Sequence, residues 1–179
     1  HNVLNASAAI SLCLNLGLNV NIIKKALRNF SGVQRRLTKV FKKNKIEFYD
    51  DYAHHPTEIK SVLEGVKKVS SKRKIIAVFQ PHRYSRIKSL KSEFASCFKS
   101  SDLVILCPVY AAGEAVDQGY NNKRFAQLIL KFSKTQVILI ENENELSNYF
   151  KKNLIMDEVV IGMGAGSISK WMHNLKGVL

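Results

Sequence analysis

The amino-acid sequence predicts an α/β fold, because apolar runs of strand length alternate with amphipathic segments of helical length. The clearest buried strand is the apolar run 75–80, and the helical pattern 85–99 follows it. The same alternation continues to the end of the chain. Crossover helices of this kind connect parallel strands of one sheet. We therefore expect a three-layer sandwich built on a Rossmann-like, mostly parallel sheet.

Each element has its own sequence signal. Helices are expected at 3–16, which Gly17 would end, and at 21–29, which Asn21 would cap. Strands at 37–41 and 46–52 would form a hairpin around a Lys-Lys-Asn turn, and Pro56 with Thr57 would open a helix that runs to about 69. The remaining predictions are strands at 75–80, 103–109, 136–141 and 158–163, and helices at 85–99, 122–132, 143–152 and from 167 onward.

The first thirty residues differ in character from the rest. They are helical, and the pattern changes at Ser31-Gly32, where strands begin. We expect 1–30 to be the end of a preceding domain and 31–179 to form the main domain. The chain begins with His1 instead of Met, so we expect it to be a piece of a longer protein.

The chain has a large excess of basic residues. Its 28 Lys and Arg against 14 Asp and Glu give a formal charge of +14, which favours anionic partners. A nucleic-acid-binding domain is one alternative, but this charge is its only support, since no RNA-binding or helix-turn-helix motif is present. The basic residues are dispersed, as on a solvated surface. We therefore expect no nucleic-acid partner. We also expect no membrane partner, because no apolar run reaches membrane-spanning length.

The three cysteines, Cys13, Cys97 and Cys107, lie among apolar residues and form no CxxC pair. Cysteines in such surroundings are typically small buried hydrophobic residues. Cysteines that remain free thiols are typical of a reducing compartment. We therefore expect a cytoplasmic protein without disulfides.

Acids and histidines follow the second predicted strand, in the stretch 50–58. Asp50 and Asp51 could meet a cation or a ribose hydroxyl, and His54 or His55 could donate to phosphate or relay a proton. The alternative is a capped helix start with solvated histidines. No further His or Cys stands at ligand spacing, so we predict no metal site.

A second polar stretch, 80–86, follows the next strand. Arg83 and Arg86 are three residues apart, and they could flank one anion if a helix begins near Tyr84. Cations at a helix N-terminus oppose the macrodipole unless an anion joins them, which favours an anion site over a solvated turn.

Four weaker patterns remain. The glycine-rich segment 162–167 could let the backbone approach a ligand or could be a tight strand-to-helix turn. Arg35 and Arg36 could be a solvated pair, and Asn2 and Asn5 could be helix caps. The segment 109–114 could be a polar loop.

Together and in this order, these stretches closely resemble the Mur ligase family. The resemblance covers essentially the whole chain and rests on HNVLNA (1–6), FSGVQRR (30–36), DDYAHHPTEI (50–59), FQPHRYSR (79–86), VYAAGE (109–114) and MGAGSI (163–168). Within the family, the motifs DDYAHHPTE and QPHRYSR are typical of the ligase that adds L-alanine to UDP-N-acetylmuramate. A related HHP motif occurs in the murein tripeptide recycling ligase, which is the nearest alternative. A nucleotide- or UDP-sugar-binding module without chemistry is another.

The resemblance implies an ATP-dependent ligase that works through an acyl phosphate. His54, Arg83 and Arg86 match the family positions that face the reacting centre, where they would stabilise anionic charge. By the same resemblance, Tyr52 and His82 would help to place L-alanine, with His55 as a third substrate-binding residue.

The nucleotide side of the site is implied by the same resemblance. Asn2, Asn5, Arg36 and Asp51 match family positions that reach the nucleotide. The family's phosphate-binding loop, of the GxxGKT/S type, and the residues that hold Mg²⁺ have no counterpart in 1–179. We therefore expect ATP and Mg²⁺ to be held mainly by domains outside this chain, and the chain by itself to be inactive.

Overall fold

The computed structural model describes residues 2–70 and 72–179 in two compact units, His1–Val33 and Gln34–Leu179. The first unit contains two helices, α1 (Asn2–Asn15) and α2 (Val20–Asn29). The Asn19 side chain caps α2 by accepting a hydrogen bond from the Asn21 backbone N–H, so the prediction that Asn21 is the cap is wrong. Asn19 has the extended backbone of a cap residue, and α2 therefore begins earlier than expected.

The first unit leaves many apolar side chains exposed. Val3, Leu4 and Leu16 are each more than 70% exposed, and Ile22 on α2 is also exposed. A helix pair with this much uncovered apolar surface is typical of part of a larger domain. The assignment of 1–30 to a preceding domain stays a prediction.

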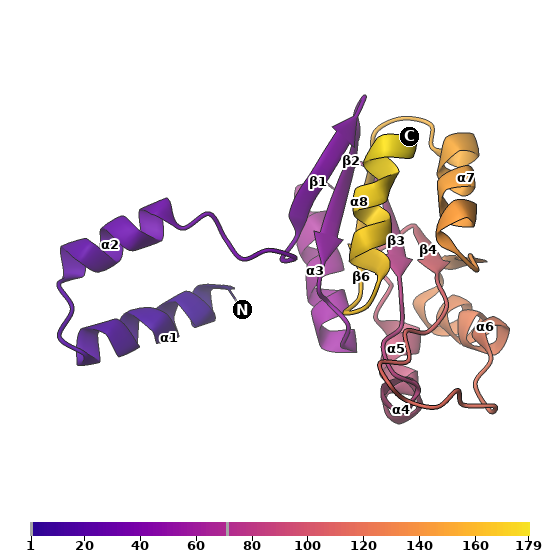
Figure 1. Ribbon diagram of the computed structural model, residues 1–179, viewed down its shortest axis with the longest axis horizontal. Helices are drawn as coiled ribbons and strands as arrows, with labels where there is room; N and C mark the ends of the chain where they lie inside the picture. The colour runs from indigo at the N-terminus through magenta and orange to yellow at the C-terminus, as the bar shows by residue number, and fades with distance from the viewer. Residues whose placement is uncertain (1, 71) are drawn as a thin grey trace. The chain divides into compact units, whose positions relative to one another are not determined.

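The second unit is built on one six-stranded sheet in the order β1-β2-β6-β3-β4-β5 (Figure 1). Only the β1–β2 hairpin is antiparallel, and each of the other neighbouring pairs is parallel. The predicted mostly parallel α/β fold is therefore confirmed. The strands are β1 (Thr38–Lys43), β2 (Ile46–Asp51), β3 (Lys74–Phe79), β4 (Leu103–Leu106), β5 (Gln136–Leu139) and β6 (Glu158–Met163).

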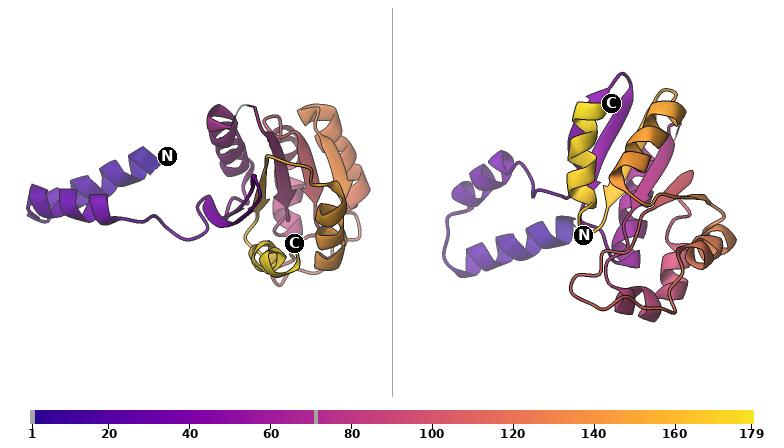
Figure 2. Two further views of the ribbon diagram at one scale, coloured as in Figure 1. Left: turned by 90° about the horizontal axis from the view of Figure 1, so that it is seen from above. Right: turned by 45° about the vertical axis from the view of Figure 1, so that its right-hand side comes forward.

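Helices cover both faces of this sheet, which makes the predicted three layers. The helices are α3 (Pro56–Val69), α4 (Tyr84–Ser89), α5 (Lys91–Ser96), α6 (Asn122–Ser133), α7 (Glu143–Asn153) and α8 (Ile168–Val178). Helices α3 to α6 pack on one face, and α7 with α8 pack on the other (Figure 2). Along β3, Ile75 and Ala77 enter the first core while Ile76 and Val78 enter the second, so both faces of the strand are buried.

Two element boundaries differ from the predictions. The segment 85–99 is not one helix, because α4 ends and α5 begins at Leu90, where the sequence has neither Gly nor Pro to mark a break. The strand expected at 103–109 ends at Leu106, since Pro108 has no N–H for the ladder. Beyond the strands, His82 and Tyr110 form one further parallel bridge.

At the amino end of the sheet, Arg73 holds β2 and β6 together. Its guanidinium donates to the Glu47 carboxylate and to the backbone oxygen of Glu158, and it pairs with Asp157. Hydrogen bonds from Lys39 and Arg73 lower the pKa of Glu47 to about 2.

Among the described residues, no helix is both long and apolar enough to cross a membrane.

Candidate active site

The polar stretches found in the sequence meet at the carboxyl edge of the sheet. Strands β2, β6, β3 and β4 are neighbours and parallel, so their carboxyl ends lie side by side. Segments 50–58, 162–167, 80–86 and 107–114 follow these ends. Ligands of open α/β sheets bind outside this edge, and it is the natural place for a site.

Asp51, at the end of β2, is buried and bonded within the chain. Its Oδ1 accepts from the Ala53 N–H at 2.7 Å, and its Oδ2 accepts from the Leu37 N–H at 2.7 Å. Burial raises the pKa of Asp51 and outweighs these two hydrogen bonds, which lower it. Since its oxygens are engaged, Asp51 holds the turn that carries Arg36 against the end of β2. Arg36 itself is exposed.

Arg35 links three parts of the site. Its Nη2 donates to the Gly164 carbonyl oxygen at 2.6 Å, and its Nε lies 3.5 Å from the buried Asp50 carboxylate. Its guanidinium also lies over the Tyr52 ring, 4.8 Å from the centroid. The backbone of Arg35 has a positive φ of 58°, which a non-glycine residue adopts only where the surroundings require it. The twin arginines therefore differ, because Arg35 is structural and Arg36 points outward.

His54 lies between Tyr52 and Glu58. Its Nδ1 is 2.9 Å from the Tyr52 carbonyl oxygen, and its ring meets the Tyr52 ring edge-on at 5.0 Å. Glu58 Oε2 accepts from the backbone N–H groups of His54 and His55. Burial alone would raise the pKa of Glu58, but these two hydrogen bonds outweigh burial and the pKa is lowered.

His55 caps helix α3. Its Nδ1 accepts from the Thr57 N–H at 3.3 Å, and Glu58 completes a capping box. The helix-cap interpretation of the 50–58 stretch is thus confirmed for His55, whereas its role in substrate binding stays a prediction.

His82 and Arg86 form the second half of the site. Arg86 Nη1 lies 3.0 Å from His82 Nδ1 and donates to the His82 carbonyl oxygen at 3.1 Å. A guanidinium has no acceptor, so Nδ1 must accept and the neutral ring carries its proton on Nε2. Burial and the nearby Arg86 charge lower the pKa of His82, which favours this neutral form. The ring stacks on Tyr110 at 5.6 Å and meets the His54 ring at 5.8 Å.

Arg83 stands directly before helix α4 and has an unusual backbone. Its φ is 70° and its ψ is 130°, and its N–H donates to the Tyr110 carbonyl oxygen at 2.9 Å. A non-glycine residue in this conformation stores about 1–3 kcal/mol of strain, and such strain clusters at functional sites. At this helix start the Glu114 carboxylate accepts from the Ser85 N–H and hydroxyl, and the anion site expected between Arg83 and Arg86 stays a prediction.

The glycine-rich turn after β6 is filled by protein atoms. A Cβ on Gly166 would lie 2.5 Å from Tyr110 Cγ and 2.6 Å from Gln80 Oε1. A Cβ on Gly164 would lie 2.8 Å from the Gln80 carbonyl oxygen. Of the two interpretations of this segment, the structure therefore supports a tight turn packed on Gln80 and Tyr110.

The structure brings together Tyr52, His54, His82 and Arg86, with Arg83 beside them in the chain. Asn5 is exposed and lies in the first unit, while the side chain of Asn2 lies outside the described residues. Within residues 2–70 and 72–179, no three His, Cys, Asp or Glu side chains lie together as metal ligands would. The catalytic and binding roles of the predicted site residues stay predictions.

Three contacts of the site were not foreseen from the sequence. Tyr110 stacks on His82, Arg35 stacks on Tyr52, and Glu114 caps α4. Segment 109–114 and the twin arginines were noticed as patterns, but nothing in them assigns a partner. The partners come from loops that the fold brings to the same edge.

Comparison with known proteins decides the family. The model of the Mur ligase, glutamate ligase domain matches residues 35–166. The chain belongs to the Mur ligase family. The expected resemblance is therefore confirmed, and the site described above is the carboxyl edge of a Mur ligase domain.

Among Mur ligases, the chain is similar to several that add L-alanine. The UDP-N-acetylmuramate–L-alanine ligase of Pelagibacter ubique is 47% identical over 98% of this chain and 38% of its own length. The one from Caulobacter vibrioides is 39% identical over the whole chain and, again, 38% of its own length. The chain thus spans about 38% of the length of the curated relatives that it matches.

Solved structures agree with the fold. UDP-N-acetylmuramate-alanine ligase MurC from Thermotoga maritima matches 99% of this chain and 37% of its own with a TM-score of 0.79 and 31% identity. A murein peptide ligase from Psychrobacter arcticus matches 99% of this chain and 36% of its own with a TM-score of 0.74 and 22% identity, which shows a shared fold.

Proposed function

We propose that this Mur ligase chain is the C-terminal part of an ATP-dependent ligase that joins L-alanine to UDP-N-acetylmuramate. The observation that carries the proposal is the joined cluster of His54, His82 and Arg86 in a chain 47% identical to such a ligase. The substrate carboxylate would be activated as an acyl phosphate, which the amine of L-alanine attacks.

The cluster supports this chemistry electrostatically. Attack on an acyl phosphate places negative charge on the carbonyl oxygen and on the departing phosphate. The guanidinium of Arg86 is oriented by His82, and His54 lies beside that ring, so fixed donors surround one region. Donors held in advance lower the barrier because they need no reorganisation during the reaction. We assign Arg83 to the same role, since it directly follows His82.

The remaining site residues divide between the substrate and the nucleotide. Tyr52, His55 and His82 would contact the amino acid side, and Tyr52 is 39% exposed, so its ring is accessible. We assign Arg36 to the nucleotide because it is exposed, with Asp51 holding its turn. By the family resemblance, we also assign Asn2 and Asn5 to nucleotide binding.

Mg²⁺ would neutralise phosphate charge during transfer. Its ligands are expected outside this chain, because the family residues that hold Mg²⁺ have no counterpart in 1–179. The exposed apolar surface of α1 and α2 supports their assignment to a central ATP-binding domain. We also place the reaction in the cytoplasm, where thiols such as the three of this chain stay reduced.

The test is turnover by the full-length protein. ADP and phosphate should be released only when UDP-N-acetylmuramate and L-alanine are both present. Arg86→Ala should lower turnover by about 100-fold or more, the effect of removing one charge-stabilising donor. Lys60→Ala is the matched control, because Lys60 is a basic residue on the exposed surface of α3 and should leave turnover unchanged. Equal turnover in both variants would contradict the site assignment.

The recycling ligase remains the second candidate, since the related HHP motif is present. It would accept a murein tripeptide in place of L-alanine, so the two functions differ in the acceptor that releases ADP. A binding module without chemistry would not release ADP with either acceptor.

A further inference from the structure

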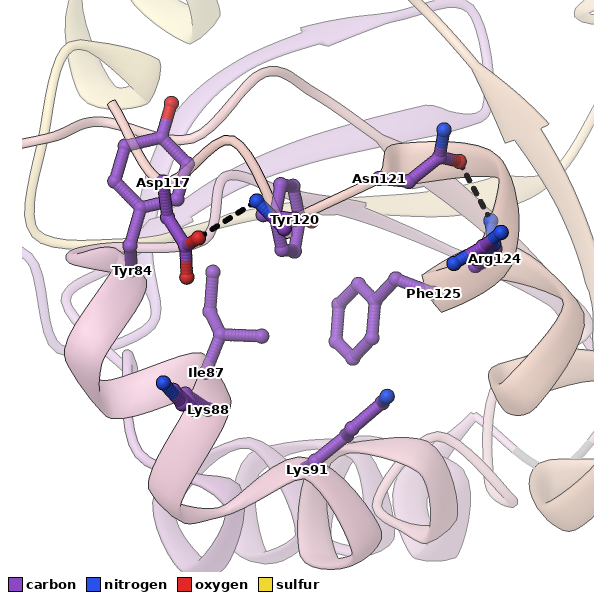
Figure 3. Close-up of a pocket in the computed structure, with 10 residues that line it drawn as sticks. Tyr84, Ile87, Lys88, Lys91, Asp117, Tyr120, Asn121, Arg124 and Phe125 are labelled. Carbon is purple, nitrogen blue, oxygen red and sulfur yellow. Dashed lines mark hydrogen bonds between the residues drawn. The ribbon is translucent and has the colours of Figure 1, made fainter.

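A cavity of about 250 Å³ lies between α4, α5, α6 and the loop 117–121, and its lining residues do not include the predicted catalytic residues (Figure 3). Its inner wall is apolar, because Ile87 and Phe125 are buried there. The rings of Tyr84 and Tyr120 meet edge-on at 5.5 Å, and Tyr120 lies 6.1 Å from Phe125. The wall is therefore mainly aromatic.

The rim of this cavity is basic. Lys88, Lys91 and Arg124 line it, against one carboxylate from Asp117. Oδ1 of Asp117 accepts the Gly119 N–H at 2.8 Å, which fixes the loop. Among the residues that the structure describes, none of the three cations is within ion-pair distance of a carboxylate. The excess of positive charge at the rim is thus not balanced by ion pairs among the described residues.

We propose that this cavity binds a small anion built on an aromatic ring. The ring would lie against Tyr84, Tyr120 and Phe125, since aromatic rings prefer offset or edge-on contact with one another. Its phosphate or carboxylate would lie between the lysines and Arg124, whose planar fork matches either group. The volume is below that of a pocket for a drug-sized ligand, which limits the ligand to about one ring with its anionic group.

The cavity is separate from the predicted centre but shares helix α4 with it. Tyr84, Ile87 and Lys88 are at helical spacing and line the cavity. Arg86, on the same short helix, instead bonds to His82. An occupant would therefore contact α4 without touching the histidines. The proposal does not depend on the ligase function.

The test is a titration of the 179-residue chain with phenyl phosphate, followed by amide chemical shifts at physiological ionic strength. Shifts should be confined to residues 84–91 and 117–125. Arg124→Ala should weaken binding by about tenfold or more, the loss of one charge-assisted pair. Lys123→Ala is the matched control, because Lys123 is the exposed neighbour of Arg124 on α6 and does not line the cavity. It should change the affinity less than about twofold.

Three further probes separate the two parts of the ligand. Inorganic phosphate and benzyl alcohol should each bind more weakly than phenyl phosphate, because each lacks one part. Benzoate tested beside phenyl phosphate shows whether carboxylate or phosphate is preferred. The proposal is overturned if neither aromatic anion binds, if inorganic phosphate binds as well as phenyl phosphate, or if Lys123→Ala weakens binding as much as Arg124→Ala. The fluorescence of Trp171 checks that each variant is folded.

Discussion

Replacement of Gly164 by Ala should destabilise the second unit strongly. Gly164 has a φ of +150°, a region that only glycine adopts freely, and a new Cβ would lie 2.8 Å from the Gln80 carbonyl oxygen and 3.1 Å from Ile168 Cγ2. The Gln80 backbone cannot easily move, since its N–H donates to the Met163 oxygen across the sheet. Backbone strain of about 1–3 kcal/mol and overpacking of about 1–3 kcal/mol together predict a loss of about 4 kcal/mol.

Urea unfolding followed by the fluorescence of Trp171 measures this loss. Trp171 is the single tryptophan of the chain and packs on the core between the sheet and α8. A loss of about 4 kcal/mol lowers the unfolding midpoint by about 2 M urea for a domain of this size. Gly65→Ala is the matched control, because a Cβ at Gly65 in α3 meets nothing within 4 Å. It should raise the stability by about 1 kcal/mol.

The two results together test the geometry of the turn. If Gly164→Ala changed the unfolding free energy by less than about 1 kcal/mol, the turn would be able to accept a side chain, and the strained, filled turn derived above would be wrong. A destabilising Gly65→Ala would instead show that α3 packs more closely than the structure has it.

Other measurements test other parts of the unit. Because the pKa of Glu47 is lowered to about 2 from 4.5, its ionised form stabilises the fold above pH 4.5 and this contribution is lost as the pH falls toward 2. Glu47→Gln should therefore lose less stability than the parent chain over that range in acid titrations. Burial raises the pKa of Cys97, and it raises that of Cys107 to about 12, so mass spectrometry after iodoacetamide at neutral pH should find label only on the cysteine of α1. Label on either buried thiol in the folded chain would contradict their burial. Lys134 ends α6 with a φ of 59°, and Lys134→Gly should raise the urea midpoint, with a gain of about 1 kcal/mol; a lower midpoint would contradict the left-handed cap.

The fold could be predicted from the sequence because a strand that is buried on both faces of the sheet has an uninterrupted apolar sequence. The run 75–80 is apolar without alternation since Ile75 and Ile76 enter different cores, and this pattern belongs to a central parallel strand. The boundaries of the helices were harder to predict. The break at Leu90 has no Gly or Pro to mark it. Asn19 caps α2 instead of the predicted Asn21, and residue type does not choose between them because both are asparagines.

The candidate site could be predicted in part for the same physical reason. His54 follows β2, and His82 and Arg86 follow β3. Parallel strands of one sheet end at a common edge, so residues that follow such strands can meet there. Arg35 could not be distinguished from Arg36 in this way. Which of two adjacent arginines turns inward depends on a positive φ that no residue type at that position demands.

The sequence by itself determined the class of fold and which residue types stand at the strand ends, because these are recorded in local patterns of burial and spacing, and its motifs carried the resemblance to the family. Only the tertiary structure decided that Asp51 is bonded to backbone amides, that the glycine turn is filled by Gln80 and Tyr110, and that three cations surround an aromatic cavity. The last two features arise from segments that are distant in the chain and meet only when the sheet has formed. No local pattern contains the distance between them.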